Sequence, residues 1–235
     1  MRFRIEDWGK LAYGPAFERQ EIIHSKIVSE KLSGGAPEYA LALVEHPHVY
    51  TLGKNGNEEN LLVDYIALQA KDAEFFRTNR GGDITYHGPG QLVGYPIMDL
   101  DAFKLGVRGY IEKLEESIIQ TIAGYGVKGD RLEGATGVWL DVGVKGRTRK
   151  ICAIGVRVSR GVTMHGFALN GNTDLNYFNF INPCGFRDKG VTSLEQELGA
   201  KIDFEELKRK YAEKFAEVFN IELINYGNKE KAGMA

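Results

Sequence analysis

Two strand-like runs follow one another in residues 150–170, which are Lys150-Ile-Cys-Ala-Ile-Gly-Val-Arg-Val-Ser-Arg-Gly-Val-Thr-Met-His-Gly-Phe-Ala-Leu-Asn170. Lys150–Ser159 and Thr163–Asn170 are rich in apolar and β-branched residues, the composition of a buried strand. Arg160-Gly161-Val162 separates them and has the length and composition of a hairpin turn. The stretch therefore predicts two neighbouring antiparallel strands at the centre of the fold.

The flanking sequence predicts further strands and three helices. The other strand-like runs are Tyr39–Glu45, Val49–Leu52, Leu92–Met98 and Val138–Val142. A helix over 15–32 is expected to bury Phe17, Ile22, Ile23, Ile27 and Val28, and one over 107–123 to bury Val107, Tyr110, Ile111, Leu114, Ile118 and Ile122. A third helix opens at Asp203, with Glu206 completing a capping box, and its apolar positions are Phe204, Leu207, Tyr211, Phe215 and Val218.

The order of these elements indicates an α+β protein with a mixed or antiparallel sheet flanked by helices, because helices come early, centrally and late with strands grouped between them. We expect a single domain over residues 1–226 and a frayed tail over 227–235. The chain has 235 residues, 43% of them hydrophobic, which is enough for one core without metals or disulfides.

Charge and cysteine usage exclude several classes of protein. A net charge of -2 gives no basic footprint for nucleic acid, and no stretch approaches the ~18 apolar residues of a membrane helix. The charged N-terminus lacks a signal-peptide apolar region, and the 2 cysteines are expected to be free thiols. We therefore expect a soluble cytoplasmic protein.

Glycines gather in residues 80–97, Arg80-Gly-Gly-Asp-Ile-Thr-Tyr-His-Gly-Pro-Gly-Gln-Leu-Val-Gly-Tyr-Pro-Ile97. Such a loop exposes backbone N–H groups and allows a ligand to approach the main chain. Gly88, Gly90 and Gly94 do not have the G-x-G-x-x-G spacing of a dinucleotide site, and no phosphate-binding G-x-x-x-x-G-K-[ST] occurs. The loop therefore suits a substrate better than a nucleotide.

A second candidate segment is Ile181-Asn-Pro-Cys-Gly-Phe186. Cys184 lies between Pro183 and Gly185, a turn that is expected to expose the sulfur. Cys152 lies in an apolar strand, where a thiol behaves as a small hydrophobic group. Cys184 is therefore the better nucleophile candidate, although a structural role stays open.

A catalytic thiol needs help to ionise near neutral pH, because its ordinary pKa is about 8.5. His24 is expected on a helix surface, and His46 with His48 lacks further ligands at zinc spacing, so no metal site is predicted. His87 and His165 lie in glycine-bearing segments and can line a pocket. A lysine ammonium can also favour the thiolate, and sequence alone does not choose among these helpers.

Between about Leu43 and Leu194 the sequence resembles the lipoyl(octanoyl) transferases, which are related in fold to lipoate ligases and biotin protein ligases. The resemblance is carried by Glu45-His-Pro, Tyr50-Thr-Leu-Gly, the Arg80–Pro96 block, Gly137-Val-Trp139, Lys150-Ile-Cys-Ala-Ile-Gly-Val-Arg157, His165-Gly-Phe-Ala-Leu-Asn170, Asp174-Leu175 and Ile181-Asn-Pro-Cys-Gly185. His48, where a second proline is common, and Cys152, where a small apolar residue is usual, depart from the family pattern.

The resemblance implies a role for each matched position. Cys184 matches the acyl-thioester cysteine, and Lys150 matches the lysine that lowers the thiol pKa and relays protons. His46 and His165 are weaker candidates. The residues matching the acyl pocket are Arg80, Gly81, Gly82, Asp83, Ile84, Thr85, Tyr86, His87, Ala153, Ile154, Gly155, Gly166, Phe167 and Ala168.

The implied reaction moves an octanoyl group from octanoyl-acyl carrier protein to Cys184 and then to a protein lysine. The implied acceptors are lipoyl domains of 2-oxoacid dehydrogenase E2 subunits and the glycine cleavage H protein, and no cofactor is required. An ATP-dependent lipoate or biotin ligase, a non-catalytic module that binds acyl carrier protein or lipoyl domains, and a cysteine–histidine hydrolase are the alternatives. Chain-length preference stays open, and a monomer is assumed.

Overall fold

The computed structural model describes residues 1–64, 66, 68, 70–182 and 189–224. The predicted tail over 227–235 lies outside the described residues. The strands are β1 (Arg2–Lys10), β2 (Tyr39–Glu45), β3 (Val49–Leu52), β4 (Glu74–Arg77), β5 (Ile84–His87), β6 (Gln91–Ile97), β7 (Asp130–Leu132), β8 (Ala135–Leu140), β9 (Arg149–Ser159), β10 (Val162–Asn170), β11 (Gly190–Val191) and β12 (Glu222–Ile224). The helices are α1 (Tyr13–Leu32), α3 (Val107–Ala123), α4 (Leu194–Leu198) and α5 (Phe204–Phe219), with 3-10 turns η1 (Glu58–Asn60) and η2 (Leu175–Phe180).

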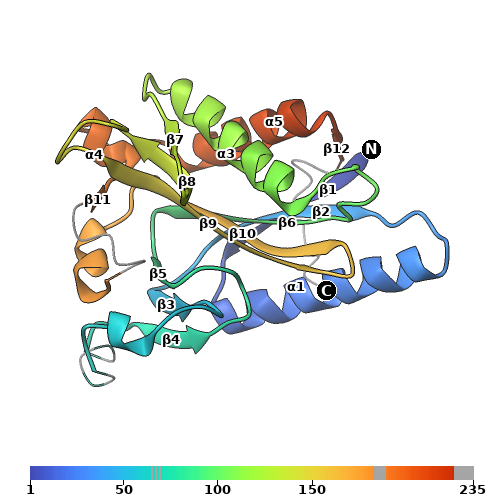
Figure 1. Ribbon diagram of the computed structural model, residues 1–235, viewed down its shortest axis with the longest axis horizontal. Helices are drawn as coiled ribbons and strands as arrows, with labels where there is room; N and C mark the ends of the chain where they lie inside the picture. The colour runs from blue at the N-terminus through green and yellow to red at the C-terminus, as the bar shows by residue number, and fades with distance from the viewer. Residues whose placement is uncertain (65, 67, 69, 183–188, 225–235) are drawn as a thin grey trace, which may run out of the picture.

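A mixed sheet forms the centre of the molecule (Figure 1). In the described part of the chain it has 9 strands in the order β12-β1-β2-β6-β10-β9-β8-β7, with β11 paired to β9. A smaller sheet has the order β4-β3-β5. Helix α1 lies on one side of the large sheet, and α3 with α5 lies on the other. This is the predicted α+β single domain with a mixed sheet flanked by helices.

The central hairpin of β9 and β10 is confirmed. The strands pair antiparallel, with Ser159 opposite Val162. Arg160 (φ 54°) and Gly161 (φ 79°) both have positive φ, which is typical of a two-residue type I′ turn. The turn is therefore one residue shorter than predicted, because Val162 already belongs to β10. All of β10 is buried, whereas most of β9 is only half-buried and faces a cavity.

Helix α1 forms where it was predicted, and of the side chains expected in the core Ile27 and Val28 are buried and Ile23 packs against it. Its buried side chains include Tyr13, Ala16 and Gln20, at helical spacings of three and four. Ile22 lies two residues after Gln20, on the other side of the helix, and is 70% exposed. The prediction for Ile22 was therefore wrong.

Two other predicted elements differ at their ends. Val107, at the start of α3, is exposed and lines the cavity, so it does not belong to the core. β8 was predicted to end at Val142 but ends at Leu140, because Asp141 has φ 49° and starts a turn. At α5 the Asp203 carboxylate accepts the N–H groups of Glu205 and Glu206, which confirms Asp203 as the predicted N-cap, whereas the Glu206 carboxylate lies 3.3 Å from Lys210 Nζ. None of the described helices is long and apolar enough to cross a bilayer.

Candidate active site

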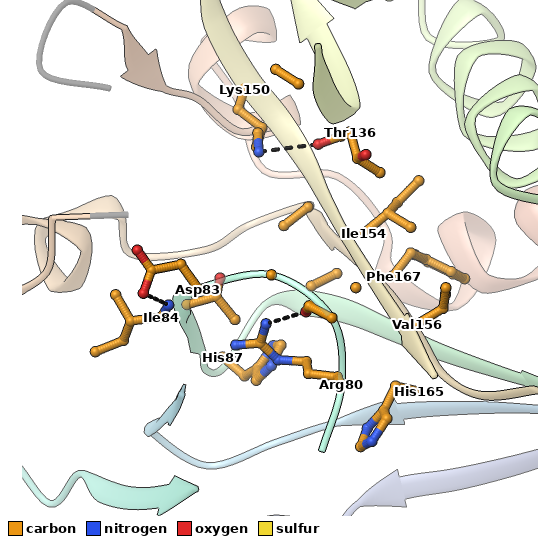
Figure 2. Close-up of a pocket in the computed structure, with 18 of the residues that line it drawn as sticks. Arg80, Asp83, Ile84, His87, Thr136, Lys150, Ile154, Val156, His165 and Phe167 are labelled. Atoms are coloured by element: carbon orange, nitrogen blue, oxygen red, sulfur yellow. Dashed lines mark hydrogen bonds between the residues drawn. The ribbon is translucent and has the colours of Figure 1, made fainter. Parts of the chain in front are cut away.

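A cavity of about 600 Å³ lies between β9, β10 and the glycine-rich segment that precedes β5. All but one of the predicted acyl-pocket residues line it. They are Arg80, Gly81, Gly82, Asp83, Ile84, Thr85, His87, Ala153, Ile154, Gly155, Gly166, Phe167 and Ala168. Figure 2 places Lys150 at one end and Arg80, His87 and His165 at the other, with Ile154, Val156 and Phe167 between them. The cavity is thus charged at its ends and apolar along one wall.

Tyr86 is the predicted pocket residue that faces elsewhere. Side chains alternate along a strand, so Tyr86 points away from its neighbours Thr85 and His87. Its ring stacks on Tyr177 at 5.0 Å, and its hydroxyl lies 2.7 Å from His48 Nδ1. Tyr86 therefore belongs to the small core that also contains Tyr50 and Ile181, and it does not line this cavity.

The glycine-rich segment is held against β9 by its main chain. Gly81 donates its N–H to the Val156 carbonyl at 2.9 Å. A Cβ at Gly155 would lie 2.9 Å from the Gly81 carbonyl oxygen, closer than real Cβ contacts allow. Gly82 has φ 85°, a conformation that glycine adopts without the strain of a side chain. Glycine at these positions is what allows the two backbones to meet at the cavity wall.

Arg80 is buried at the end of the cavity opposite Lys150 (Figure 2). Its guanidinium donates to the Thr51 carbonyl at 2.5 Å, to the Thr51 hydroxyl at 3.0 and 3.2 Å, and to the Gly81 carbonyl at 3.0 Å. These bonds compensate for the loss of hydration that burial imposes on a cation. Arg80 therefore fixes the conformation of the loop and leaves a positive charge near the cavity wall.

Lys150 enters the cavity from β9, opposite Trp139 of β8. Its Nζ donates to the Thr136 carbonyl at 3.2 Å (Figure 2). The same Nζ lies 4.5 Å from the centroid of the Trp139 ring. A carbonyl oxygen and an aromatic face are both favourable contacts for a lysine ammonium. The two contacts hold the amine at this end of the cavity.

The two cysteines differ in what the structure describes. Cys184 lies outside the described residues, which stop at Asn182 and resume at Lys189, a residue that lines the cavity. Cys152 is fully buried in the main core, and burial raises the pKa of its thiol well above the ordinary value. Cys152 is therefore the inert apolar residue that its strand predicted.

The histidines do not meet Lys150 in this site. His87 and His165 line the cavity at the Arg80 end, and burial lowers the pKa of each to about 3. His46 lies one layer back, where its Nδ1 donates to the Leu11 carbonyl at 2.6 Å and its Nε2 accepts from the Tyr95 hydroxyl at 2.7 Å. All three are neutral near pH 7.

His24 was expected on the surface and is half-buried instead. It lines a second cavity between α1 and the end of the β9–β10 hairpin, with Arg157 and Arg160. Burial, then the charge of Arg157, lowers its pKa. His24 is separate from the cavity that holds Lys150.

Several lining residues were not predicted. They are Tyr13, Val93, Tyr95, Val107, Ile111, Gly134, Ala135, Thr136, Trp139, Val156, Phe178, Lys189, Gly190 and Val191. Trp139 belongs to a motif already quoted above, but nothing in the sequence indicates that its ring meets Lys150. That contact depends on the pairing of β8 with β9, which only the folded chain defines.

Comparison with known proteins gives three findings. The model of the lipoyl protein ligase A/B catalytic domain matches residues 13–216. An octanoyltransferase of Parabacteroides distasonis is 54% identical over 217 residues, which cover 92% of this chain and 98% of that one. An octanoyltransferase of Flavobacterium johnsoniae is 51% identical over 230 residues, covering 95% and 99% of the two chains.

Solved structures agree on the fold. A lipoate-protein ligase A bound with ATP aligns with a TM-score of 0.70 at 16% identity, covering 95% of this chain and 88% of that one. The bi-partite lipoate protein ligase of Thermoplasma acidophilum aligns with a TM-score of 0.69 at 16% identity, covering 95% and 86%. At such identities the likeness concerns the fold alone.

Proposed function

The chain belongs to the family of the lipoyl protein ligase A/B catalytic domain, and we propose that it transfers an octanoyl group from octanoyl-acyl carrier protein to a lysine of lipoyl domains. It is an acyltransferase, as relatives at 54% and 51% identity that span nearly its whole length are octanoyltransferases. The observation that carries the proposal is the cavity itself, in which an ammonium at one end faces an apolar wall and a glycine-rich loop.

In the first half-reaction the Cys184 thiolate attacks the thioester carbonyl of the donor. A tetrahedral oxyanion forms and collapses, the carrier thiolate leaves and takes a proton, and Cys184 carries the octanoyl group. Two features support this step. Residues on either side of Cys184 in the sequence, Phe178 and Lys189, line the cavity, and the Lys150 ammonium supplies a positive charge that favours a thiolate.

In the second half-reaction a lysine amine attacks the acyl-enzyme. The C–N bond forms, the C–S bond breaks, and the proton lost by the amine passes to the Cys184 sulfur through Lys150. The product is an amide on the acceptor, and the thiol is restored. No nucleotide enters either half-reaction, because the donor thioester is already activated.

The neutral histidines support Lys150 as the helper. His87 and His165 have pKa values of about 3, so they carry no charge to stabilise a thiolate near pH 7. Figure 2 draws both at the end of the cavity away from Lys150. Of the helpers that the sequence left open, these observations support Lys150.

Intact-mass spectrometry tests the proposal. Mixed with octanoyl-acyl carrier protein and no ATP, the wild type should gain the mass of one octanoyl group, which hydroxylamine removes from a thioester. Cys184→Ser should block that turnover, and the matched Cys152→Ala should retain most of it. Apo-lipoyl domain added afterwards should take the group over as a hydroxylamine-stable amide. A requirement for ATP, or loss of transfer only in Cys152→Ala, would refute the proposal.

A further inference from the structure

A row of buried polar groups runs behind the cavity wall, from the glycine-rich loop to the strand of Lys150. Its members are the side chains of Arg80, Thr51, His87, Gln91 and Asn170 and the main chain of Thr192, and each residue is at most 7% exposed. Buried polar groups are costly unless each donor meets an acceptor. The direction of every bond in the row can therefore be worked out from the groups at its ends.

The Thr192 end fixes the two amides. A backbone carbonyl can only accept, so the Asn170 Nδ2 that lies 2.9 Å from the Thr192 oxygen must be the donor. Asn170 Oδ1 is then an acceptor, and it faces Gln91 Nε2 at 2.9 Å. The second Nε2 proton of Gln91 goes to the Tyr86 carbonyl at 3.2 Å. Because Asn170 Oδ1 and the Tyr86 carbonyl both accept from the same atom of the Gln91 amide, that atom must be the nitrogen.

The orientation of Gln91 determines the tautomer of His87. Gln91 Oε1 lies 2.8 Å from His87 Nδ1, and an amide oxygen can only accept, so the proton is on Nδ1.

The Arg80 end agrees with this assignment. The Thr51 hydroxyl oxygen accepts from Arg80 Nε and Nη2 at 3.2 and 3.0 Å, which leaves its own proton for His87 Nε2 at 3.4 Å. Donors therefore point one way along the whole row.

The surroundings of His87 keep the ring neutral. Burial is the main cause of its low pKa. Electrostatic interaction with His46, Arg80 and His165 lowers the pKa further, and the hydrogen bond to Gln91 raises it in part. The His46 ring lies 5.9 Å away, and the Tyr13 ring stacks on His87 at 6.3 Å. Neither a carboxylate nor any other anion is among these neighbours in the described part of the chain.

We propose that Gln91 is a positioning residue that holds His87 as the Nδ1–H tautomer, with the Nε2 lone pair toward Thr51 and Arg80. The row also joins the two ends of the cavity, because the Thr192 N–H donates to the Lys150 carbonyl at 2.9 Å. This inference rests on the proposed function in one respect, namely that the Arg80 loop is the acyl wall. Its consequence is that His87 serves as a fixed neutral acceptor and exchanges no proton with the thiol.

Nuclear magnetic resonance of the full chain with ¹⁵N-labelled histidine tests the tautomer without any acyl transfer. The His87 signals are assigned by their loss in His87→Gln. The wild type should show a protonated Nδ1 and an unprotonated Nε2, with no titration between about pH 5.5 and 8, since the pKa is about 3. A protonated Nε2, or a titration in that range, overturns the proposal.

Two variants separate the ends of the row. In Gln91→Met the Nδ1 proton loses its acceptor. The Thr51 hydroxyl, 3.4 Å from Nε2, can accept an Nε2 proton once Arg80 Nη2 bonds only the Thr51 carbonyl, which it already reaches at 2.5 Å, so the ring should switch to the Nε2–H tautomer. The matched Thr51→Val removes the other neighbour and should leave the proton on Nδ1. A switch in Thr51→Val, or none in Gln91→Met, assigns control to the Arg80 end and overturns the role of Gln91.

Gln91→Glu supplies a readout that loss of packing does not mimic. A carboxylate beside Nδ1 should raise the His87 titration midpoint by about 1–3 pH units, and the acylation rate should gain a matching pH dependence. If the wild-type spectrum shows the Nδ1–H tautomer but the protein does not react with octanoyl donors, only the proposed function is refuted. An unmoved midpoint in Gln91→Glu would refute the positioning role.

Discussion

Gly155→Ala tests whether the backbone contact between β9 and the glycine-rich loop shapes the cavity. The new Cβ would lie 2.9 Å from the Gly81 carbonyl oxygen and 3.3 Å from Arg80 Cδ. Both atoms belong to a loop pinned by the Gly81–Val156 hydrogen bond, so relief requires the loop to move. Overpacking of this kind costs about 1–3 kcal/mol. If the substitution destabilises the loop conformation that binds the acyl donor by this amount, kcat/KM for acylation should drop by about 5- to 150-fold.

Gly190→Ala is the matched control. Gly190 lines the same cavity, but its Cβ would meet only Arg149 Cβ at 3.6 Å, an ordinary contact. Single-turnover acylation and thermal unfolding are measured for both variants and the wild type. Gly155→Ala should lose acylation while it unfolds as one cooperative transition, and Gly190→Ala should resemble the wild type. Equal rates for the two variants would refute the steric reasoning.

Three further predictions concern the ends of the cavity and the buried histidines. Lys150→Met keeps an apolar side chain beside Trp139 but removes the charge, so acylation near neutral pH should fall by about 10²–10⁴-fold and recover in part at higher pH. Lys150→Arg keeps the charge and should keep the Cys184 thiol reactive. Equal rates of Cys184 alkylation in the wild type and the two variants would remove Lys150 from the site. Gly82→Val places a branched side chain at φ 85° and should form little acyl-enzyme. Wild-type kcat/KM should fall by about 200-fold when four methylenes are removed from the donor, at ~0.8 kcal/mol each, and a flat length profile would argue against an acyl wall here. Burial lowers the pKa of His46 to about 4 and those of His87 and His165 to about 3, so the unfolded chain takes up protons first. Stability should therefore be lost as the pH falls from about 6.5 toward 4, by about 1.4 kcal/mol per pH unit for each histidine, and a free energy of unfolding that stays level over that range would contradict this.

The strands predicted most accurately are those in which most residues are apolar. Residues 39–45, 49–52 and the β9–β10 hairpin were predicted almost residue by residue, because apolar strands between turns carry their own signal. β1 was missed although Arg2-Phe-Arg-Ile-Glu6 alternates polar and apolar residues as a half-buried strand does, because the charges of this stretch were interpreted only as the lack of a signal peptide. Ile22 was misplaced because it stands directly beside Ile23 in the sequence, and only the fold shows that Ile23 packs against the core while Ile22 faces solvent.

In the candidate site, too, residues whose role depends on their sequence neighbours were predicted, and residues whose role depends on distant contacts were not. The loop Arg80–His87 was predicted because glycines that permit close backbone approach are visible in the sequence. Gln91 was part of the quoted block but received no role, since its meaning depends on Asn170, far along the chain and opposite it in the β6–β10 pair. Likewise, the histidines could not be ranked against Lys150 until burial was known.

Strand β9 sets the geometry of the cavity, because it carries Lys150 at one end and the Val156 carbonyl that holds the loop near the other. Six residues at about 3.3 Å each separate the two positions by roughly 20 Å. Effects at sites so far apart usually add within about 0.5 kcal/mol unless something couples them. Gly155→Ala and Lys150→Arg should therefore be additive in the free energy of acylation, provided that the buried row only positions its own residues. Their non-additivity, abolished in a Gln91→Met background, would show instead that the row transmits loop displacement to the Lys150 strand.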